Sequence, residues 1–349
     1  MPLPTQITAL LLVAAALLPV VIGLIFAPNL TKELLRDLRF PRILHFVALA
    51  FLGVALQLKS APGTPEGSDA AEGPLSSPIT STGSVHRSHL SSFHFHPLQN
   101  PGSDPFASLS AAFSTLVLSL TFAAIFAIVT NNLADLAADH ISNPNRPTVR
   151  GTVAPKPYLI AGILCQIWAL AIPWLLPTAQ ALPITLAVAG ISLGYFVYSC
   201  PPLRLKRVPI LAKVIIGANS WVVALGGFAL SGGAIADFPV AWSIFILVPL
   251  ALAANFIDLK DVEGDRAIGI ATLPVLMGVQ NARHLIAAAT AATYIMGGLL
   301  LNLWWAWPLN LIALATHMYL LYRPHADERL IFLVHVGSLF GLGGMLLIA

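Results

Sequence analysis

Residues 255–266 read NFIDLKDVEGDR, and this acidic stretch ends a long apolar run in a chain with only fifteen acidic residues out of 349. If the stretch is helical, at about 100° per residue, Asp258, Asp261 and Asp265 share one face within an arc of roughly 60°. Three like charges on one face repel one another unless a cation lies between them. Carboxylates at flexible spacing are typical ligands of Mg²⁺, which binds one or two carboxylates together with water and substrate phosphates. The stretch therefore predicts a metal ion and a phosphorylated partner.

The composition indicates a membrane protein. Hydrophobic residues make up 57% of the chain, charged residues make up 9%, and the mean hydropathy is +0.82. Soluble domains carry about 25% charged residues. We therefore expect an all-α polytopic membrane protein whose partner is the lipid bilayer, with no nucleic-acid partner. Cys165 and Cys200 lie in or beside apolar runs without metal-ligand spacing and are interpreted as buried thiols.

Ten apolar runs predict membrane helices. They are residues 7–26, 43–58, 107–130, 157–176, 180–199, 210–230, 238–257, 284–304, 305–322 and 330–348. The first run lacks the basic region of a cleaved signal peptide, so it is interpreted as a retained helix. Residues 59–105 are rich in Ser, Pro, Gly and His, which predicts a flexible insertion. The expected division is an extra N-terminal helix with a basic loop at 1–38, then a helical bundle at 39–349.

The basic residues between the runs predict the orientation. If the loop with Lys32 and Arg42 is cytoplasmic, alternation of ten helices places sixteen of the eighteen Lys and Arg residues on that side. Only Lys59 and Arg87 then lie opposite. Cytoplasmic loops of membrane proteins carry such an excess of Lys and Arg. The same alternation places the acidic stretch on the cytoplasmic side, so we expect the active site there.

A second acidic stretch lies at the same predicted depth. Residues 131–139 read NNLADLAAD, which places Asn131, Asp135 and Asp139 on one face of a helix. Basic side chains suited to diphosphate oxygens follow in the sequences NPNRP and YSCPPLRLKR. The alternative is that these acids are solvated at helix ends and that the basic residues only set the topology. Six of the fifteen acids in two stretches at matching depth favour a shared site.

Together these motifs resemble the UbiA superfamily of intramembrane prenyltransferases. The resemblance rests on Asn131-x3-Asp135-x3-Asp139, Asn145-Arg146-Pro147, Tyr198-Ser-x-Pro-Pro with Lys206-Arg207, Asp258-x2-Asp261-x-Glu263-Gly264-Asp265 and Thr272-Leu273-Pro274. It is similar to the branch with chlorophyll synthase, homogentisate prenyltransferases and archaeal ether-lipid geranylgeranyl transferases. The resemblance implies a bundle of nine transmembrane helices around a central cavity, in which two Asp-rich motifs hold a prenyl diphosphate through Mg²⁺. The helix at 7–26 and the insertion at 59–105 are additional to this pattern.

Two residue positions also depart from the family pattern. The first motif of the family usually begins Asn-Asp, whereas its second position here is Asn132, which removes one carboxylate. The Tyr-x3-Lys spacing of the hydroxybenzoate branch is absent, since Tyr198 lies eight residues before Lys206. These departures bear on the acceptor chemistry and on the roles of Tyr198 and Lys206.

The predicted site contains two groups of residues. The expected catalytic residues and Mg²⁺ ligands are Asp135, Asp139, Asp258, Asp261 and Asp265. The expected contacts of the diphosphate are Asn131, Arg146, Tyr198, Lys206, Arg207, Asn255 and Lys260. The alternatives are that Tyr198 anchors the chain at the membrane interface and that Asn131 and Asn255 only bond neighbouring helices.

Three functions are compatible with these residues to different degrees. The first is transfer of an isoprenyl group from a prenyl diphosphate to an aromatic or lipid-like acceptor, by ionisation of the allylic diphosphate. The alternative is a membrane terpene cyclase that acts on the prenyl diphosphate without an acceptor, which Asn132 favours. A transporter or scaffold predicts acids near mid-membrane, whereas the acids here lie at helix ends. Product analysis with the diphosphate alone distinguishes the first two functions.

Overall fold

The computed structural model describes residues 5–60, 105–267, 269–323 and 328–349. Over these residues the structure is helical and contains no strand. The α-helices are α1 (Thr5–Phe26), α2 (Pro28–Arg36), α3 (Phe40–Ser60), α4 (Pro105–Ala134), α5 (Leu136–Ser142), α6 (Pro155–Ala171), α7 (Thr178–Ser199), α8 (Pro209–Leu230), α9 (Val240–Phe245), α10 (Ala251–Ala253), α11 (Val262–Ala267), α12 (Leu273–Met277), α13 (Val279–Leu301), α14 (Trp307–Tyr322) and α15 (Glu328–Ile348). The short 3₁₀ and π segments are η1 (Ile172–Leu175), η2 (Leu205–Arg207), η3 (Ile235–Asp237), η4 (Ile246–Leu250), η5 (Ala254–Leu259) and η6 (Trp304–Ala306).

Each of the ten predicted apolar runs is helical in the structure. Within the described ranges, nine helical segments are long and apolar enough to cross a membrane. The remaining run, at 305–322, forms α14, which has 16 residues and is therefore shorter. Between α13 and α14 the chain turns at Asn302, whose φ of 53° lies in the left-handed region that Asn tolerates. The prediction of an all-α, multi-pass membrane protein is confirmed.

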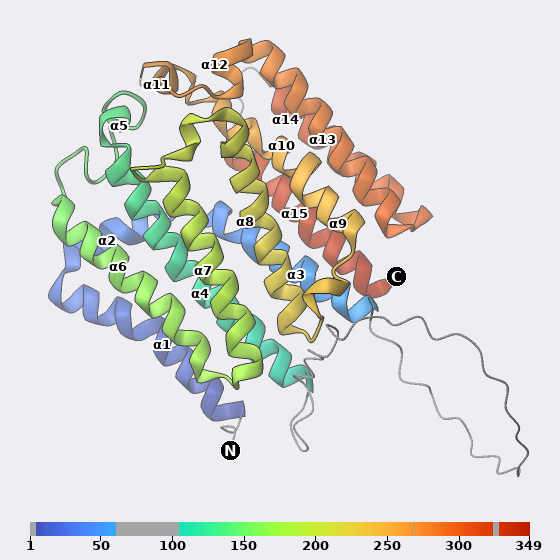
Figure 1. Ribbon diagram of the computed structural model, residues 1–349, viewed down its shortest axis with the longest axis horizontal. Helices are drawn as coiled ribbons and strands as arrows, with labels where there is room; N and C mark the ends of the chain where they lie inside the picture. The colour runs from blue at the N-terminus through green and yellow to red at the C-terminus, as the bar shows by residue number, and fades with distance from the viewer. Residues whose placement is uncertain (1–4, 61–104, 268, 324–327) are drawn as a thin grey trace, which may run out of the picture.

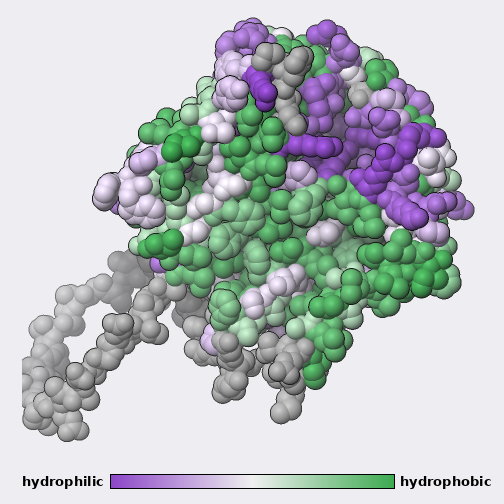
Figure 2. Space-filling model, turned by 180° about the vertical axis from the view of Figure 1, so that it is seen from behind, coloured by the Kyte–Doolittle hydropathy of each residue, from purple (hydrophilic) through white to green (hydrophobic). Residues whose placement is uncertain are grey.

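The long helices run roughly parallel to one another (Figure 1), and their contacts follow a ring across which α3 and α8 also pack together. α3 packs on α4, α8 and α15, while α4 packs on α7 and also on α6. From α8 the ring continues through η4 and α10 to α13, then to α14 and back to α15. α1 lies against α4 and η1 and is largely exposed. The apolar side chains outside the ring form the belt coloured green in Figure 2, as a surface facing lipid requires.

The polar end of the bundle holds the short helices. α5, α11 and α12 lie at one end of the molecule in Figure 1, and α5 contacts α11. Figure 2 shows hydrophilic side chains gathered around a hollow at one end, above the apolar belt. The long helices therefore form the sides of the molecule, and α5, α11 and α12 cover its polar end.

Two glycines allow α3 and α8 to approach closely. A Cβ atom on Gly53 would overlap the carbonyl oxygen of Ala224, and a Cβ atom on Gly227 would overlap that of Ala50. Because lipid tails are as apolar as the helix surfaces, association within a membrane depends on close packing of such small residues. The α3 and α8 pair thus has little tolerance for a larger side chain at either glycine.

We expect Gly227→Val to prevent correct assembly of the bundle. The added side chain meets backbone atoms that cannot move independently, and overpacking costs about 1–3 kcal/mol or more. The measurement is the thermal unfolding midpoint and gel-filtration profile in detergent. Gly337→Ala in α15 is the matched control, because no atom lies within 4 Å of its added Cβ. An unchanged unfolding midpoint in Gly227→Val would contradict the close packing of α3 and α8.

The predicted domain division includes residues that the structure does not describe. The N-terminal run at 7–26 forms α1. The insertion predicted at 59–105 lies outside the described residues except at its ends, where α3 extends to Ser60 and α4 begins at Pro105. The division into 1–38 and 39–349 stays a prediction.

Candidate active site

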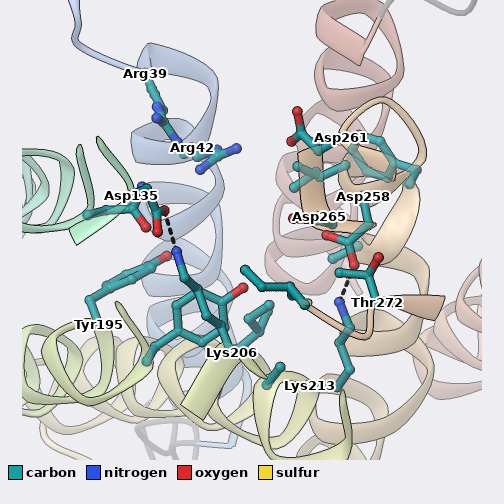
Figure 3. A pocket seen from close by; sticks show the side chains of 18 of the residues that line it. Arg39, Arg42, Asp135, Tyr195, Lys206, Lys213, Asp258, Asp261, Asp265 and Thr272 are labelled. Atoms are coloured by element: carbon teal, nitrogen blue, oxygen red, sulfur yellow. Dashed lines mark hydrogen bonds and ion pairs between the residues drawn. The ribbon is translucent and has the colours of Figure 1, made fainter. Parts of the chain in front are cut away.

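Both acidic stretches border one cavity at the polar end of the bundle. The cavity has a volume of about 200 Å³. Its lining includes the predicted metal ligands Asp135, Asp139, Asp258, Asp261 and Asp265. Figure 3 shows Asp135 on one side of the cavity and Asp258, Asp261 and Asp265 on the other. Lys206 lies beside Asp135, and Lys213 lies beside Asp258. Two stretches that are far apart in the sequence therefore meet at one place.

The second acidic stretch interrupts its helix, so the prediction of a continuous helical face there was wrong. The first is interrupted only at Asp135, where the helical hydrogen bonds from Asp135 N to Asn131 O and from Asp139 N to Asp135 O are both kept. α4 ends at Ala134, and α5 begins after Asp135. Likewise η5 ends at Leu259, and α11 begins only at Val262. Asp side chains compete with helical backbone hydrogen bonds and favour such helix ends. Both groups of carboxylates still line the cavity, because α5 and α11 fold over the polar end and contact each other.

The first group of carboxylates is balanced by cations. Asp135 accepts a hydrogen bond from Arg204 Nη2 at 2.8 Å, and it also pairs with the buried ammonium of Lys206. Asp139 pairs with Arg146, which comes from the loop after α5. Charge-assisted contacts of this kind hold both partners in defined positions. Two carboxylates thus face three cations, so this wall of the cavity carries no excess negative charge.

The second group of carboxylates carries excess negative charge. Asp258 accepts a hydrogen bond from Lys213 of α8. Among the ion pairs of the described residues, none includes Asp261 or Asp265. Burial, together with the neighbouring carboxylates of Asp258 and Asp261, raises the pKa of Asp265 to about 6. Burial also raises the pKa of Asp261. A cation at this wall would stabilise the ionised carboxylates.

The donor atoms fit Mg²⁺ bound together with a phosphorylated substrate. In the part of the chain that the structure describes, no three His, Cys, Asp or Glu side chains are close enough to hold a metal by themselves. Mg²⁺ typically uses one or two carboxylates and completes its shell with water and substrate phosphates. Oxygen donors on two walls, with excess negative charge at Asp261 and Asp265, match that mode of binding.

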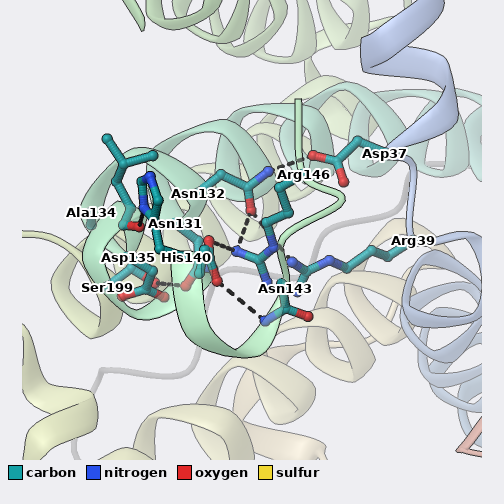
Figure 4. A network of polar contacts seen from close by, with 12 residues as sticks. Asp37, Arg39, Asn131, Asn132, Ala134, Asp135, His140, Asn143, Arg146 and Ser199 are labelled. Carbon is teal, nitrogen blue, oxygen red and sulfur yellow. Dashed lines mark hydrogen bonds and ion pairs between the residues drawn. The ribbon is translucent and has the colours of Figure 1, made fainter. Parts of the chain in front are cut away.

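A buried polar network supports the first acidic stretch (Figure 4). Asn132 is fully buried, and its amide nitrogen donates to Asp37 and, at 3.0 Å, to the Tyr158 hydroxyl. Its amide oxygen accepts from Arg146 Nη1 at 2.8 Å and from Arg39 Nη2 at 3.4 Å. An amide donates and accepts at once, whereas a carboxylate only accepts. Asn132, which departs from the family motif, therefore suits a position beside the Asp37 carboxylate.

Comparison with known proteins identifies the family. Residues 98–333 match the UbiA prenyltransferase family. The chain belongs to this family. It is 34% identical over 227 residues to the homogentisate phytyltransferase of Synechocystis sp., an alignment that covers 62% of this chain and 70% of that protein. It is 33% identical over 175 residues to the chlorophyll synthase of Oryza sativa, an alignment that covers 47% of this chain and 44% of that protein.

The fold of this UbiA-family protein is shared with solved structures. A UbiA homologue from Archaeoglobus fulgidus bound to GPP and Mg²⁺ has a TM-score of 0.61 at 17% identity, and covers 91% of this chain and 100% of its own. An apo UbiA homologue from Aeropyrum pernix K1 has a TM-score of 0.56 at 18% identity, with 89% and 99% coverage. At this identity the likeness shows the fold alone. The predicted family, the membrane fold and the class of prenyl-group transferase are confirmed.

Four of the predicted diphosphate contacts line the cavity of this UbiA-family protein. They are Asn131, Arg146, Tyr198 and Lys206. The oxygen of Asn131 also accepts a hydrogen bond from Ser199 of α7 at 2.9 Å, so this side chain joins two helices as well. The predicted structural role of Asn131 and its place in the cavity are therefore compatible.

Three other predicted contacts lie outside the cavity lining. Arg207 is exposed, and Lys260 is exposed and pairs with Glu328. Asn255 is buried, and its amide nitrogen donates to two carbonyl oxygens of its own helical run. None of these three side chains lines the cavity, and their contacts with a diphosphate stay predictions.

Three cavity cations were not among the predicted site residues. Lys213, Arg39 and Arg42 all line the cavity. In the sequence these residues predict only which side of the membrane each loop faces. The feature that distinguishes Lys213 is its place inside an apolar run, because a charged side chain within a membrane helix is costly and usually functional.

Proposed function

We propose that this UbiA-family transferase moves an isoprenyl group from a prenyl diphosphate to an aromatic or lipid-like acceptor in a Mg²⁺-dependent reaction. The observation that supports this proposal is a polar cavity that adjoins an apolar pocket. The second pocket lies between α3, α4 and α7, is lined by apolar side chains such as Phe46, Leu120 and Ile191, and shares Arg39 and Asn131 with the polar cavity. A diphosphate suits the first space, and an isoprenyl chain suits the second.

The reaction breaks the bond between the allylic carbon and the diphosphate oxygen. The electron pair leaves with the diphosphate, the acceptor forms a bond to the allylic carbon, and the acceptor releases a proton. Lys206, Lys213 and Arg42 line the cavity and would stabilise the negative charge that develops on the leaving group. The aspartates of the two walls would hold Mg²⁺ through one or two carboxylates together with the substrate phosphates, and the ion would add positive charge beside the leaving group.

The cavity walls also protect the reactive carbon from water. Phe46, Tyr195, Phe256 and Phe332 also border the cavity, and Phe46 and Phe256 are almost fully buried. Exclusion of water favours capture of the allylic cation by the acceptor over its hydrolysis.

The test of the proposed function is a product analysis with purified protein in detergent. We expect geranylgeranyl diphosphate to be consumed only when Mg²⁺ and an acceptor such as homogentisate or an isoprenylglyceryl phosphate are both present. Addition of EDTA should stop the reaction. A cyclic product formed without an acceptor would overturn the proposal in favour of the cyclase, although the names of the relatives, such as homogentisate phytyltransferase, support transfer.

We further propose that the cavity opens toward the cytoplasm. The support is the excess of Lys and Arg on one side of the predicted topology, together with the polar end of the molecule in Figure 2. A cysteine introduced at the exposed residue Glu263, in a chain without Cys165 and Cys200, should react with an impermeant maleimide in inside-out vesicles only. Labelling in right-side-out vesicles would reverse the orientation.

We expect Lys213→Met and Arg207→Met to behave differently. Loss of the Lys213 ammonium removes a cation from the cavity and should lower kcat/KM for the prenyl diphosphate by about 10- to 100-fold, equivalent to ~1.5–3 kcal/mol. Arg207 lies outside the cavity lining and serves as the matched control, which should change kcat/KM by less than about twofold. Steady-state kinetics with varied prenyl diphosphate provide the measurement. Equal losses in both variants would contradict the assignment of Lys213.

A further inference from the structure

Three buried histidines form a cluster that the mechanism above does not use. His45 of α3 is 8% exposed, His317 of α14 is 0% exposed, and His335 of α15 is 5% exposed. They lie five residues after the start of α3, five before the end of α14 and seven after the start of α15. At 1.5 Å per residue they are about 7–10 Å below those helix ends. Ionisable side chains at such depth in a membrane helix usually have a function.

The cluster consists of contacting rings. The imidazoles of His45 and His335 are stacked, with ring centroids 5.2 Å apart, and His317 meets His335 edge-on at 6.3 Å. Phe332 lies 6.1 Å from His335 and 5.6 Å from Phe256, measured between ring centroids. These five rings form a compact aromatic group that joins α3, α14 and α15 to the segment η5.

Each imidazole has hydrogen-bonding capacity that the fold does not use. His45 Nε2 lies 3.3 Å from Ser220 Oγ, and His317 Nδ1 lies 3.4 Å from the Tyr294 hydroxyl. Nδ1 of His45 and Nε2 of both His317 and His335 have no hydrogen-bond partner among the described residues. A buried polar atom without a partner is costly, and its retention calls for an explanation such as a bound ligand.

Two of the three histidines lie at the inner wall of the proposed active site, and His317 contacts one of them, His335, edge-on. His45, His335, Ser220, Phe256 and Phe332 all line the cavity that the two acidic stretches border. Glu328, at the start of α15, pairs with Lys260 beside the second acidic stretch, so His335 is about 10 Å deeper than that stretch at 1.5 Å per residue. A molecule at this wall would approach the allylic carbon from the side away from the diphosphate cations.

We propose that the histidine cluster, defined as His45, His317 and His335, is the acceptor subsite and that it binds a hydroxylated aromatic ring. This inference rests on the proposed transferase function and selects between the two acceptor classes named there. A planar ring packs favourably against Phe256, Phe332 and the imidazoles. A ring hydroxyl both donates and accepts a hydrogen bond, as the nitrogens of neutral imidazoles do.

An isoprenylglyceryl phosphate fits this wall less well. The residues that contact the histidine cluster through hydrogen bonds and ring contacts include Ser220, Tyr294, Phe256 and Phe332, with no Lys or Arg among those contacts. A phosphate placed there would lose water without gaining a cation, which is unfavourable. The cavity cations Arg146, Lys206 and Lys213 pair with aspartates of the acidic stretches, where the leaving diphosphate requires them.

The test compares acceptors and histidine variants in purified protein with Mg²⁺ and geranylgeranyl diphosphate. Wild-type protein should use homogentisate, a dihydroxylated aromatic acid, with a higher kcat/KM than an isoprenylglyceryl phosphate. His45→Phe and His335→Phe keep an aromatic ring but remove the nitrogens. In both, the KM for homogentisate should rise about tenfold or more, while the KM for geranylgeranyl diphosphate should change by less than about twofold.

Three further measurements make the outcome decisive. His335→Gln restores an amide donor and acceptor and should recover part of the acceptor affinity. His284→Phe is the matched control, because His284 is exposed on α13 outside the cavity lining, and its kinetics should equal those of wild type. The thermal unfolding midpoint in detergent verifies that each variant is folded. If a Phe variant does not fold, the preference of wild type for homogentisate or for the isoprenylglyceryl phosphate tests the inference instead.

Two results would overturn the inference, and they differ from failure of the proposed function. Preference of wild type for the isoprenylglyceryl phosphate, or an unchanged KM for homogentisate in folded His45→Phe and His335→Phe, would remove the aromatic acceptor subsite while leaving prenyl transfer intact. Absence of Mg²⁺-dependent binding of geranylgeranyl diphosphate to wild type would instead refute the transferase proposal itself, and the acceptor subsite with it.

Discussion

Asp261→Asn is expected to lower kcat for prenyl transfer by about 100- to 1000-fold while leaving the protein folded. The substitution removes one negative charge from the wall of the cavity that carries excess negative charge, and the side chain keeps nearly the same shape. Because Asp261 is in none of the ion pairs of the described chain, no buried cation is left without a partner. The reduced activity would therefore reflect lost metal and diphosphate binding rather than unfolding.

The control for this variant comes from the same stretch of sequence. Glu263→Gln removes one negative charge only two residues away, but Glu263 is exposed and lies outside the cavity lining. Its kcat should remain within about twofold of wild type. Kinetics at saturating Mg²⁺, with unfolding midpoints for both variants, provide the comparison. Near-normal turnover in Asp261→Asn would refute the mechanism with two acidic stretches.

Asp135 is a less suitable test of the same mechanism. Its carboxylate pairs with the buried ammonium of Lys206 and with Arg204. Removal of the carboxylate would leave a buried charge without a partner, and breaking a buried pair in this way costs about 3–5 kcal/mol. Loss of activity in an Asp135 variant would thus combine lost chemistry with lost stability.

Asn132→Asp is expected to destabilise the protein by about 1–3 kcal/mol. The network around Asn132 is charge-balanced, since Arg39 and Arg146 face the carboxylates of Asp37 and Asp139. A carboxylate at 132 adds a negative charge beside Asp37. It also removes the amide group that donates a hydrogen bond to Asp37. The measurement is the thermal unfolding midpoint in detergent, converted to a difference in free energy of unfolding where unfolding is reversible.

The double variant tests whether the carboxylate can be exchanged between the two positions. Asp37→Asn alone removes the partner of the Asn132 amide and should also destabilise the protein. Asp37→Asn combined with Asn132→Asp restores both the charge balance and one donor, so its stability should exceed the value that the two single variants predict by addition. Simple additivity would show that the contact between Asp37 and Asn132 contributes nothing measurable.

The membrane helices were predictable because hydrophobicity belongs to contiguous residues. The runs at 107–130 and 330–348 became α4 and α15 with ends moved by only a few residues. The exceptions lie at the acidic stretches, where apolar periodicity stops and short polar side chains end the helix. A continuous helical face through Asp258, Asp261 and Asp265 was therefore wrong, although all three aspartates still line the cavity.

The partners within the site were much less predictable. Arg207 and Lys206 are adjacent in the sequence, yet Lys206 is buried against Asp135 and Arg207 is exposed. Lys213, which pairs with Asp258 across two helices, shows no signal in the sequence beyond its unusual place in an apolar run. Rotation of a helix by one residue moves a side chain by about 100°, so small changes in packing decide which cations enter a cavity.

The sequence by itself determined the membrane class, the helix positions, the family and the two acidic motifs, since all of these follow from the composition and order of neighbouring residues. Only the tertiary structure decided which residues meet across helices. It brought Asn132 against Asp37, and it placed His45 and His335 at one wall of the cavity with His317 packed against His335. Such contacts depend on the directions and close packing of separate helices, which no local pattern of residues contains.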